Sequence, residues 1–310
     1  MTILRNVLLA ASTNAWLRER ATKTGFVMRS VSRFMPGERL DDALAAATRQ
    51  RAQGIGAILT HLGENLTTAD EAEAVMRHYL EALDRVHAER LDAQISVKPT
   101  QLGLDLDAEI CFRNLQRLID RAAQLHNFIW IDMESVQYVD ATLALFRRAR
   151  ERSPFVGVAL QAYLYRTERD LDRLLPLGVS LRLVKGAYLE SPRVAYPKKA
   201  DVDANYYRLA CRILNESQHD GALLHVATHD GALIQKLNAY AETRNVPASA
   251  YEYAMLYGIQ QPLQQQMVAA GHRLRVLISY GEYWFPWYMR RLAERPANMV
   301  FVMKNLLPGS

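Results

Sequence analysis

The residues of this sequence that could carry chemistry are polar side chains at the ends of short apolar segments. They are Lys98, Asp132, Gln161, Arg182, Lys185, Thr228 and His229. In a parallel barrel the carboxyl ends of the strands meet at one face, and enzymes of this architecture place their chemistry there. One polar residue at such a position is more often a solvated loop residue. A set that converges on one face predicts a ligand site.

Cations outnumber acids in this predicted site. It would hold Lys98, Arg182, Lys185, Arg290 and Arg291. A concave site with that balance suits an anionic ligand, which could be a carboxylate, a phosphate-bearing cofactor or both. The two adjacent arginines lie on a predicted helix, so an ordinary surface ion-pair ladder remains an alternative for them.

Two other patterns are weak evidence for a metal site or for nucleobase binding. His225 and His229 have the spacing of a helical zinc pair, but they lie on a predicted strand, and no glutamate base stands between them. The aromatic run 280–288 could stack a nucleobase, although such runs more often cap a core or wall a pocket. We therefore expect no metal ion.

Eight short apolar segments, each followed by a helical stretch, must position these residues. The segments are 56–60, 94–98, 128–132, 156–161, 180–185, 223–228, 248–253 and 274–278, of which 248–253 matches the pattern least well. Buried parallel strands have this appearance, and eight such units in about 250 residues are typical of a (β/α)₈ TIM-type barrel. A doubly wound open sheet would normally carry a G-x-G-x-x-G turn, which is absent.

The bulk composition fits one folded domain. We expect a single domain over 1–310, with N-terminal helices in 1–50 and the barrel in 55–306. The 38 Lys and Arg against 33 Asp and Glu are scattered, which argues against a nucleic-acid partner. Cys111 and Cys211 are expected to be buried reduced thiols. Without a transmembrane-length run or a good signal peptide, a cytoplasmic protein is expected, with peripheral membrane association left open.

Five stretches in order carry a family resemblance that runs from about Phe26 to Leu306. They are 161–167 (QAYLYRT), 182–188 (RLVKGAY), 227–230 (ATHD), 255–258 (MLYG) and 290–298 (RRLAERPAN). The sequence resembles the FAD-dependent proline dehydrogenase family, in its short monofunctional bacterial form. The resemblance implies a (β/α)₈ barrel with non-covalent FAD. It also implies oxidation of L-proline to 1-pyrroline-5-carboxylate, with the electrons passed to a quinone or another acceptor.

The resemblance also assigns roles by position. It implies that Asp132 and Arg182 are the catalytic residues. The implied substrate-binding residues are Lys98, Tyr188, Leu256, Leu277, Arg290 and Arg291. The implied FAD contacts are Gln161, Arg182, Lys185, Gly186, Ala187, Thr228 and His229. Physical chemistry agrees, because two guanidinium groups and an ammonium fix a carboxylate through charge-assisted bonds, and Asp132 would offset their excess charge.

The last predicted strand departs from the family. Leu277 stands where a tyrosine is usual, Ser279 replaces a common proline, and Leu189 replaces an aromatic or basic residue. We expect a roomier pocket and a weak preference for proline over 4-substituted analogues. Tyr280 or Tyr283 could refill the space, and a one-residue slip would place Val276 or Ile278 at the wall.

The sequence leaves three alternative functions open. They are a flavoenzyme for another cyclic amino acid such as 4-hydroxyproline, a non-catalytic flavin-binding barrel, and a phosphate-handling barrel. The oligomeric state is not predicted.

Overall fold

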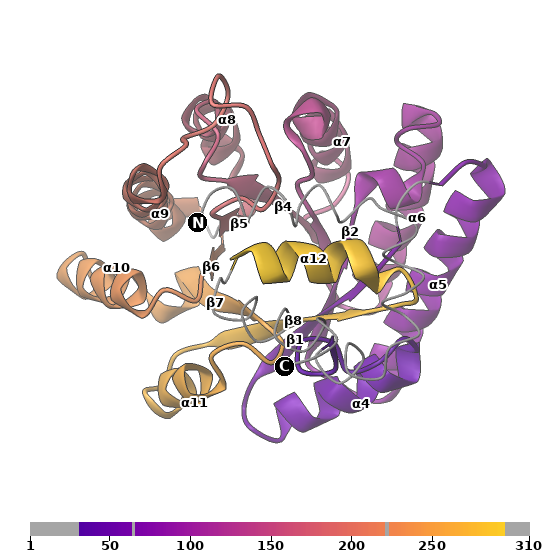
Figure 1. Cartoon of the computed structure of the whole chain (residues 1–310), viewed down its shortest axis with the longest axis horizontal. Coiled ribbons are helices and arrows are strands. Elements are labelled where there is room, and N and C mark those ends of the chain that lie inside the picture. Colours follow the sequence, from indigo (N-terminus) through magenta and orange to yellow (C-terminus); the bar gives the residue numbers. More distant parts are fainter. Residues whose placement is uncertain (1–30, 64–65, 221–222, 295–310) are drawn as a thin grey trace, which may run out of the picture.

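The computed structural model describes residues 31–63, 66–220 and 223–294, without the side chains of 217–220 and 290–294. Eight strands close into a parallel barrel in sequence order, β1 pairing with both β2 and β8 (Figure 1). The strands are β1 Gly56–His61, β2 Ala93–Val97, β3 Ile129–Ile131, β4 Val156–Gln161, β5 Ser180–Val184, β6 Leu224–Ala227, β7 Tyr251–Leu256 and β8 Leu274–Tyr280. The predicted barrel is therefore confirmed.

The start of the seventh strand was predicted wrongly. The expected seventh segment, 248–253, begins in a single 3₁₀ turn, Ala248–Ala250, and β7 starts only at Tyr251. Pro247 leads into the turn with an extended backbone, and the Ala250 N–H bonds back to the Pro247 carbonyl. Small residues after a proline suit a tight turn better than a strand.

Helices alternate with the strands and pack around the barrel. They are α4 Leu40–Arg51, α5 Ala69–Ala88, α6 Ala108–Gln124, α7 Val139–Arg150, α8 Thr167–Leu174, α9 Lys199–Asp220, α10 Gly231–Thr243, α11 Gln261–Ala269 and α12 Trp284–Glu294. Several begin at a side-chain cap. Thr68 accepts from the Glu71 N–H, Asp107 from Ile110 and Asp230 from Leu233, which satisfies amides that the first helical turn leaves unpaired.

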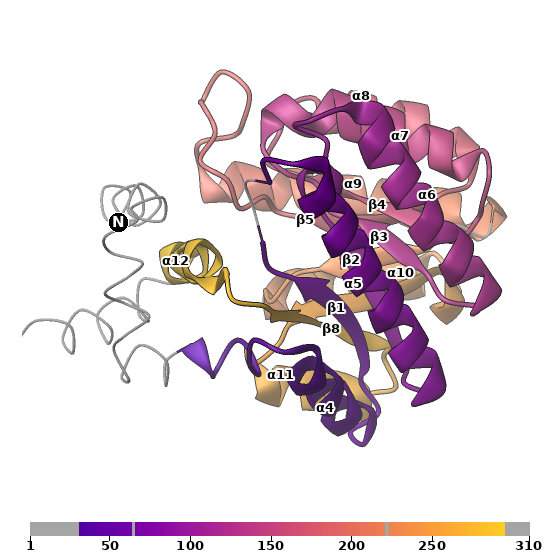
Figure 2. The ribbon, with the colours of Figure 1, turned by 90° about the vertical axis from the view of Figure 1, so that its right-hand side faces the viewer.

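The first and last described helices occupy unusual places. Helix α4 lies beside β1 and β8 in the outer ring, between α11 and α5, although it precedes the first strand (Figure 1). Helix α12, which follows β8, leaves the ring and lies across one end of the barrel (Figure 2). Because α4 covers the outer face of β8, α12 is free to place its residues over the barrel mouth.

Side-chain alternation along the strands separates the outer core from the barrel interior. Outward positions are aliphatic and fully buried against the helices, as at Ile95, Ile131, Val158 and Val276. Inward positions hold polar residues such as Asp132, Gln161 and Arg182 together with apolar ones such as Ile58 and Val184, and the site below uses both kinds. Cys111 is buried and Cys211 is half-buried, and both are free thiols. In the described ranges no helix combines the length and apolar character needed to cross a membrane.

Candidate active site

A cavity of about 530 Å³ opens at the carboxyl ends of the strands. The predicted residues that line it are Lys98, Asp132, Gln161, Arg182, Lys185, Gly186, Ala187, Tyr188, Thr228, His229, Leu256 and Leu277. Every predicted site residue whose side chain is described therefore lines this one cavity, both those expected from the strand ends and those implied by the family resemblance. Arg290 and Arg291 belong to α12, which lies over this mouth, but their side chains are outside the described part of the chain.

A buried ion network lies on one wall of the cavity. Nζ of Lys98 donates to Oδ2 of Asp132 at 3.0 Å, and Nη1 of Arg182 donates to Oδ1 of the same carboxylate at 3.1 Å. The Ser96 hydroxyl donates to Asp132 at 2.7 Å and accepts from Arg182 at 3.0 Å. Asp132 therefore bridges two cations supplied by β2 and β5.

Burial and the neighbouring charges act in opposite directions on this network. Burial raises the pKa of Asp132, but Lys98 and Arg182 outweigh it and hold that pKa below its ordinary value. Burial likewise disfavours the Lys98 ammonium, yet Asp132, with help from Tyr188 and Tyr79, raises the pKa of Lys98. Burial lowers the pKa of Arg182 to about 10, although Asp132 and Glu252 act against it. All three side chains are ionised at neutral pH.

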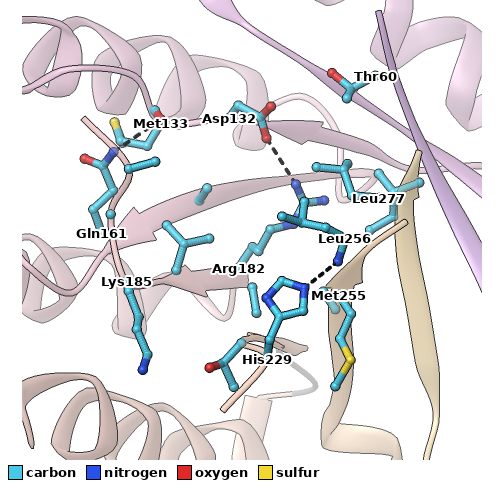
Figure 3. Close-up of a pocket in the computed structure, with 18 of the residues that line it drawn as sticks. Thr60, Asp132, Met133, Gln161, Arg182, Lys185, His229, Met255, Leu256 and Leu277 are labelled. Atoms are coloured by element: carbon cyan, nitrogen blue, oxygen red, sulfur yellow. Dashed lines mark hydrogen bonds and ion pairs between the residues drawn. The ribbon is translucent and has the colours of Figure 1, made fainter. Parts of the chain in front are cut away.

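Buried side chains in the cavity wall present polar atoms that the described part of the protein does not use. Nε and Nη2 of Arg182, and Oε1 of Gln161, have no hydrogen-bond partner among the described residues. The Gln161 amide nitrogen is bonded to the Met133 carbonyl at 3.4 Å, which turns Oε1 away from it. Both side chains line the cavity (Figure 3). Unpaired buried donors and acceptors are costly, so these atoms fit a polar, planar ligand that supplies both kinds of partner.

A second ion cluster lies across the cavity at the amino ends of α9 and α10. Nζ of Lys185 donates to Asp203 at 2.5 Å and to Asp230 at 3.1 Å. Lys199 is bonded to Asp203 as well. Sequence reasoning noticed Lys185 and Asp230 but missed Lys199 and Asp203. Their i, i+4 spacing early in the helix after strand five was the available signal.

The backbone after β5 turns sharply into the cavity. Gly186 has φ +115°, and a Cβ there would lie within 2.5 Å of the Tyr163 ring. Only glycine fits both the conformation and the space. The turn brings Gly186, Ala187 and Tyr188 to the cavity wall, where exposed amides can approach a bound ligand closely.

His229 bonds to the backbone at the end of β7, on the other side of the cavity. Its Nε2 accepts from the Leu256 N–H at 2.9 Å, which places the proton of a neutral ring on Nδ1 (Figure 3). His225, its candidate zinc partner, lies deeper, in the barrel, with Nε2 2.5 Å from Oε1 of Glu252. Since His229 Nε2 is occupied by an amide and His225 faces a carboxylate, the two rings do not present a common metal site.

Leu277 faces the cavity, as predicted. It pairs with Ile58 and Leu256, which line the same wall. The alternative of a slipped register is wrong, because Val276 and Ile278 are fully buried in the outer core.

The space beside Leu277 is not refilled by either candidate tyrosine. The Tyr280 hydroxyl is bonded to Nε2 of His78 at 2.9 Å, on the outer side of the strand, and 55% of Tyr283 is exposed. Neither lines the cavity. Further cavity-lining residues that sequence reasoning did not single out are Thr60, Leu62, Met133, Met255 and Trp287.

Comparison with known proteins gives a consistent family. The family model described as proline dehydrogenase matches residues 43–304. Proline dehydrogenase 1 of Bacillus subtilis subsp. natto is 35% identical over 305 residues, which are 98% of this chain and 99% of that protein. Proline dehydrogenase of Deinococcus radiodurans is 36% identical over 282 residues, covering 89% of this chain and 90% of its own.

A solved structure shares the fold. Proline utilization A (PutA) from Bdellovibrio bacteriovorus, inactivated by N-propargylglycine, superposes with a TM-score of 0.80 at 26% identity. The match covers 86% of this chain and 33% of that one, so this chain spans about a third of the larger protein.

Proposed function

This chain belongs to the proline dehydrogenase family, and we propose that it oxidises L-proline to 1-pyrroline-5-carboxylate with FAD as its cofactor. The observation that carries the proposal is the cavity itself. It combines cations suited to a carboxylate with buried polar atoms that have no partner within the described protein. The reaction needs both features, because an amino acid and a polar ring must lie side by side.

The residues on the β4 to β6 side of the cavity fit a flavin nucleotide. The proposed contacts are Gln161, Arg182, Lys185, Gly186, Ala187, Thr228 and His229. The unpaired atoms of Gln161 and Arg182 suit the donor and acceptor edge of an isoalloxazine ring. The Lys185 and Lys199 ammonium groups suit a diphosphate, which would compete for them with Asp203 and Asp230.

The remaining cations fit the substrate. Lys98, together with Arg290 and Arg291, would bind the proline carboxylate through charge-assisted bonds. Tyr188, Leu256 and Leu277 would enclose the apolar ring carbons. This arrangement fixes which carbon beside the nitrogen faces the cofactor, and positioning contributes much of the rate in such reactions.

The chemistry divides between the cofactor and the protein. When bound, the flavin supplies the two-electron acceptor for the hydride that leaves the ring carbon next to nitrogen. The amine loses a proton, and the carbon–nitrogen double bond forms. Arg182 stabilises negative charge at the cofactor face, and Asp132 holds Arg182 and Lys98 in place while balancing their charge. We assign no side chain as the base, and the amine proton would pass to water at the site or be lost to bulk solvent before binding.

Exposed apolar residues near the mouth support a lipophilic acceptor. Leu106, Tyr165, Leu189 and Tyr283 are between 37% and 55% exposed and follow β2, β4, β5 and β8. Exposed apolar side chains on these loops would suit a quinone, and they would allow the protein to touch a membrane surface peripherally. Binding of the protein to lipid vesicles, and its loss in Leu189→Ser with Tyr283→Ser, tests this part.

One observation favours a second candidate substrate. Leu277 gives the cavity a short apolar wall, and neither Tyr280 nor Tyr283 closes it. A proline bearing a substituent at carbon 4, such as trans-4-hydroxyproline, would then compete with proline.

The test begins with the cofactor and ends with the substrate. Denaturing the purified protein should release one FAD per chain, with no covalent adduct. A screen of cyclic amino acids with an artificial dye acceptor should give the highest turnover with L-proline or a 4-substituted proline. Stoichiometric FMN, no flavin after supplementation, or no turnover with any of these amino acids would contradict the proposal.

A further inference from the structure

The interior of the barrel beneath Arg182 is polar, which is unusual for this architecture. Barrel interiors are normally filled by layers of branched aliphatic residues. Here Trp130, His225, Glu252 and Arg275 occupy the inward positions one step closer to the amino ends of their strands than the cavity residues. We call these four residues the barrel floor. Trp130, His225 and Glu252 are at most 2% exposed.

The barrel floor is a continuous chain of contacts. The Trp130 and His225 rings lie 4.0 Å apart between centroids, and Nε2 of His225 lies 2.5 Å from Glu252. Glu252 accepts from Nε of Arg275 at 2.7 Å and from Arg273 at 3.1 Å.

The floor ends directly under the active site. Cζ of Arg182 lies 4.7 Å from the centroid of Trp130. Arg182, His225 and Glu252 are also register partners on adjacent strands β5, β6 and β7. Apart from this stacking, Arg182 bonds to the described residues through one atom, because Nη1 donates to both Ser96 and Asp132. The plane of the guanidinium therefore depends on the indole beneath it.

Glycines make room for the two largest members of the floor. A Cβ at Gly157 would lie 2.6 Å from the Trp130 ring and 2.9 Å from the Ser180 carbonyl. A Cβ at Gly56 would lie 2.7 Å from Nη1 of Arg275. Neighbouring strands thus lack side chains where the floor needs space, so the floor is a close-packed unit and not a loose filling.

We propose that Trp130, His225 and Glu252 are positioning residues that orient Arg182 and set its effective charge toward the bound flavin. The indole face supports the guanidinium plane through a cation–π contact. The His225 ring holds the indole, and the Glu252 carboxylate partly cancels the field of Arg182 from below. This inference rests on the proposed flavin site, and it assigns the three residues no contact with substrate.

The proposal predicts opposite shifts of the flavin reduction potential in two variants. Trp130→Leu removes the support, so Arg182 should stabilise the reduced flavin less. The equilibrium constant for two-electron reduction should fall roughly tenfold, equivalent to a midpoint about 30 mV more negative. Glu252→Gln removes a negative charge near Arg182, so the constant should rise roughly threefold. A merely structural floor would not produce shifts of opposite sign.

The measurement is a reductive titration of the purified holoproteins with a chemical reductant and a reference dye. Trp130→Phe should restore most of the potential, because it keeps a ring under Arg182. Phe146→Leu is the matched control, since Phe146 is fully buried in the outer core on α7 and should leave the potential unchanged. The dissociation constant of a ring-oxygen analogue of proline, measured by flavin absorbance, should stay within about threefold in all variants.

Each result decides the proposal. Opposite shifts in Trp130→Leu and Glu252→Gln support it. Unchanged potentials, or shifts of the same sign in both variants, overturn it. If Trp130→Leu holds no flavin, Glu252→Gln decides alone, and an unchanged potential there overturns the proposal. Because the titration uses no proline, a failure of proline to reduce the wild type would count against the proposed function and not against this inference.

Discussion

The two ends of the barrel interior hold similar ions in opposite situations. At the mouth, Asp132 bridges Lys98 and Arg182, and Arg182 keeps two unused donors facing the cavity. In the floor, Glu252 is surrounded by His225, Arg275 and Arg273. The Glu252 carboxylate thus has its partners within the protein, whereas Arg182 keeps buried donors that a ligand can use. The difference indicates that the mouth binds ligands and that the floor supports the residues of the mouth.

The largest expected effect is on stability, and it should be greater at the floor than at the mouth. Glu252→Ala removes a buried carboxylate that pairs with Arg275 and Arg273 and lies against His225, so the free energy of unfolding should fall by about 3–5 kcal/mol. Asp132→Ala should cost clearly less, because its site opens to a cavity that water can enter. Urea unfolding of both variants measures the difference. Equal losses would mean that the two networks do not differ in the way described.

The second effect is on activity, and it should appear mainly at the mouth. Asp132→Ala leaves Lys98 and Arg182 with excess positive charge and less order. We expect kcat/KM for proline to fall by roughly 30- to 1000-fold, equivalent to about 2–4 kcal/mol. Binding of an anionic ring-oxygen analogue should persist or improve. A parallel loss of analogue affinity would make Asp132 a structural brace only.

The same size of effect is expected for the two arginines of α12. Arg290→Met and Arg291→Met should each raise KM by roughly 30- to 1000-fold while the flavin content survives, since a charge-assisted bond to a carboxylate is worth about 2–4 kcal/mol here. Steady-state kinetics with proline measures it. Kinetics like those of the wild type in either variant would place that arginine in a surface ion-pair ladder.

A smaller effect concerns pH and lies outside both networks. Burial and the neighbouring His78 lower the pKa of His61 to about 4 from 6.5. The unfolded chain then binds a proton that the folded chain does not, so stability is complete above pH 6.5 and falls as the pH drops toward 4. The loss should be on the order of 2 kcal/mol.

The titration of His61 can be isolated by substitution. His61 packs against His78 and Tyr280, with the Tyr79 hydroxyl bonded to its backbone. His61→Gln should flatten the dependence of unfolding free energy on pH between 6.5 and 4. His87→Gln, at an exposed position on the same helix as His78, is the control and should leave it unchanged. An identical slope in wild type and His61→Gln would contradict the assignment.

The smallest expected effect is on substrate preference, and it concerns the apolar wall of the mouth. Leu277→Tyr should fill the apolar wall and raise the preference for proline over trans-4-hydroxyproline roughly tenfold to a hundredfold, equivalent to about 1–3 kcal/mol. The ratio of the two kcat/KM values in parent and variant measures it. An unchanged ratio would show that Leu277 does not contact the substrate ring.

The mouth was predictable from sequence, and the floor was not. Lys98, Asp132 and Gln161 close apolar segments, and the topology of parallel strands brings such residues together without further information. His225 and Glu252 also lie within apolar segments, but their partners come from different strands. Sequence reasoning compared His225 with His229, which is close along the chain, and so missed the contact with Glu252 on the neighbouring strand.

Some mouth residues depend on details that a pattern does not contain. Asp203 reaches Lys185, and Lys199 reaches Asp203, because of where α9 begins after the long connection 185–198. The start of β7 likewise depends on a local detail, the turn after Pro247. A polar residue at an inward position of a largely apolar strand was the one available signal for the floor, as at His225, Glu252 and Arg275.

Anaerobic mixing of the purified holoprotein with L-proline tests the central claim most directly, namely that the mouth binds a flavin and an amino acid side by side. The account predicts that the visible absorbance of the oxidised flavin is lost in a single turnover, with one equivalent of 1-pyrroline-5-carboxylate formed. In Lys98→Met the flavin should still be bound, and the concentration of proline needed for half-maximal reduction should rise. Flavin that remains oxidised at high proline, 4-hydroxyproline included, would contradict the account.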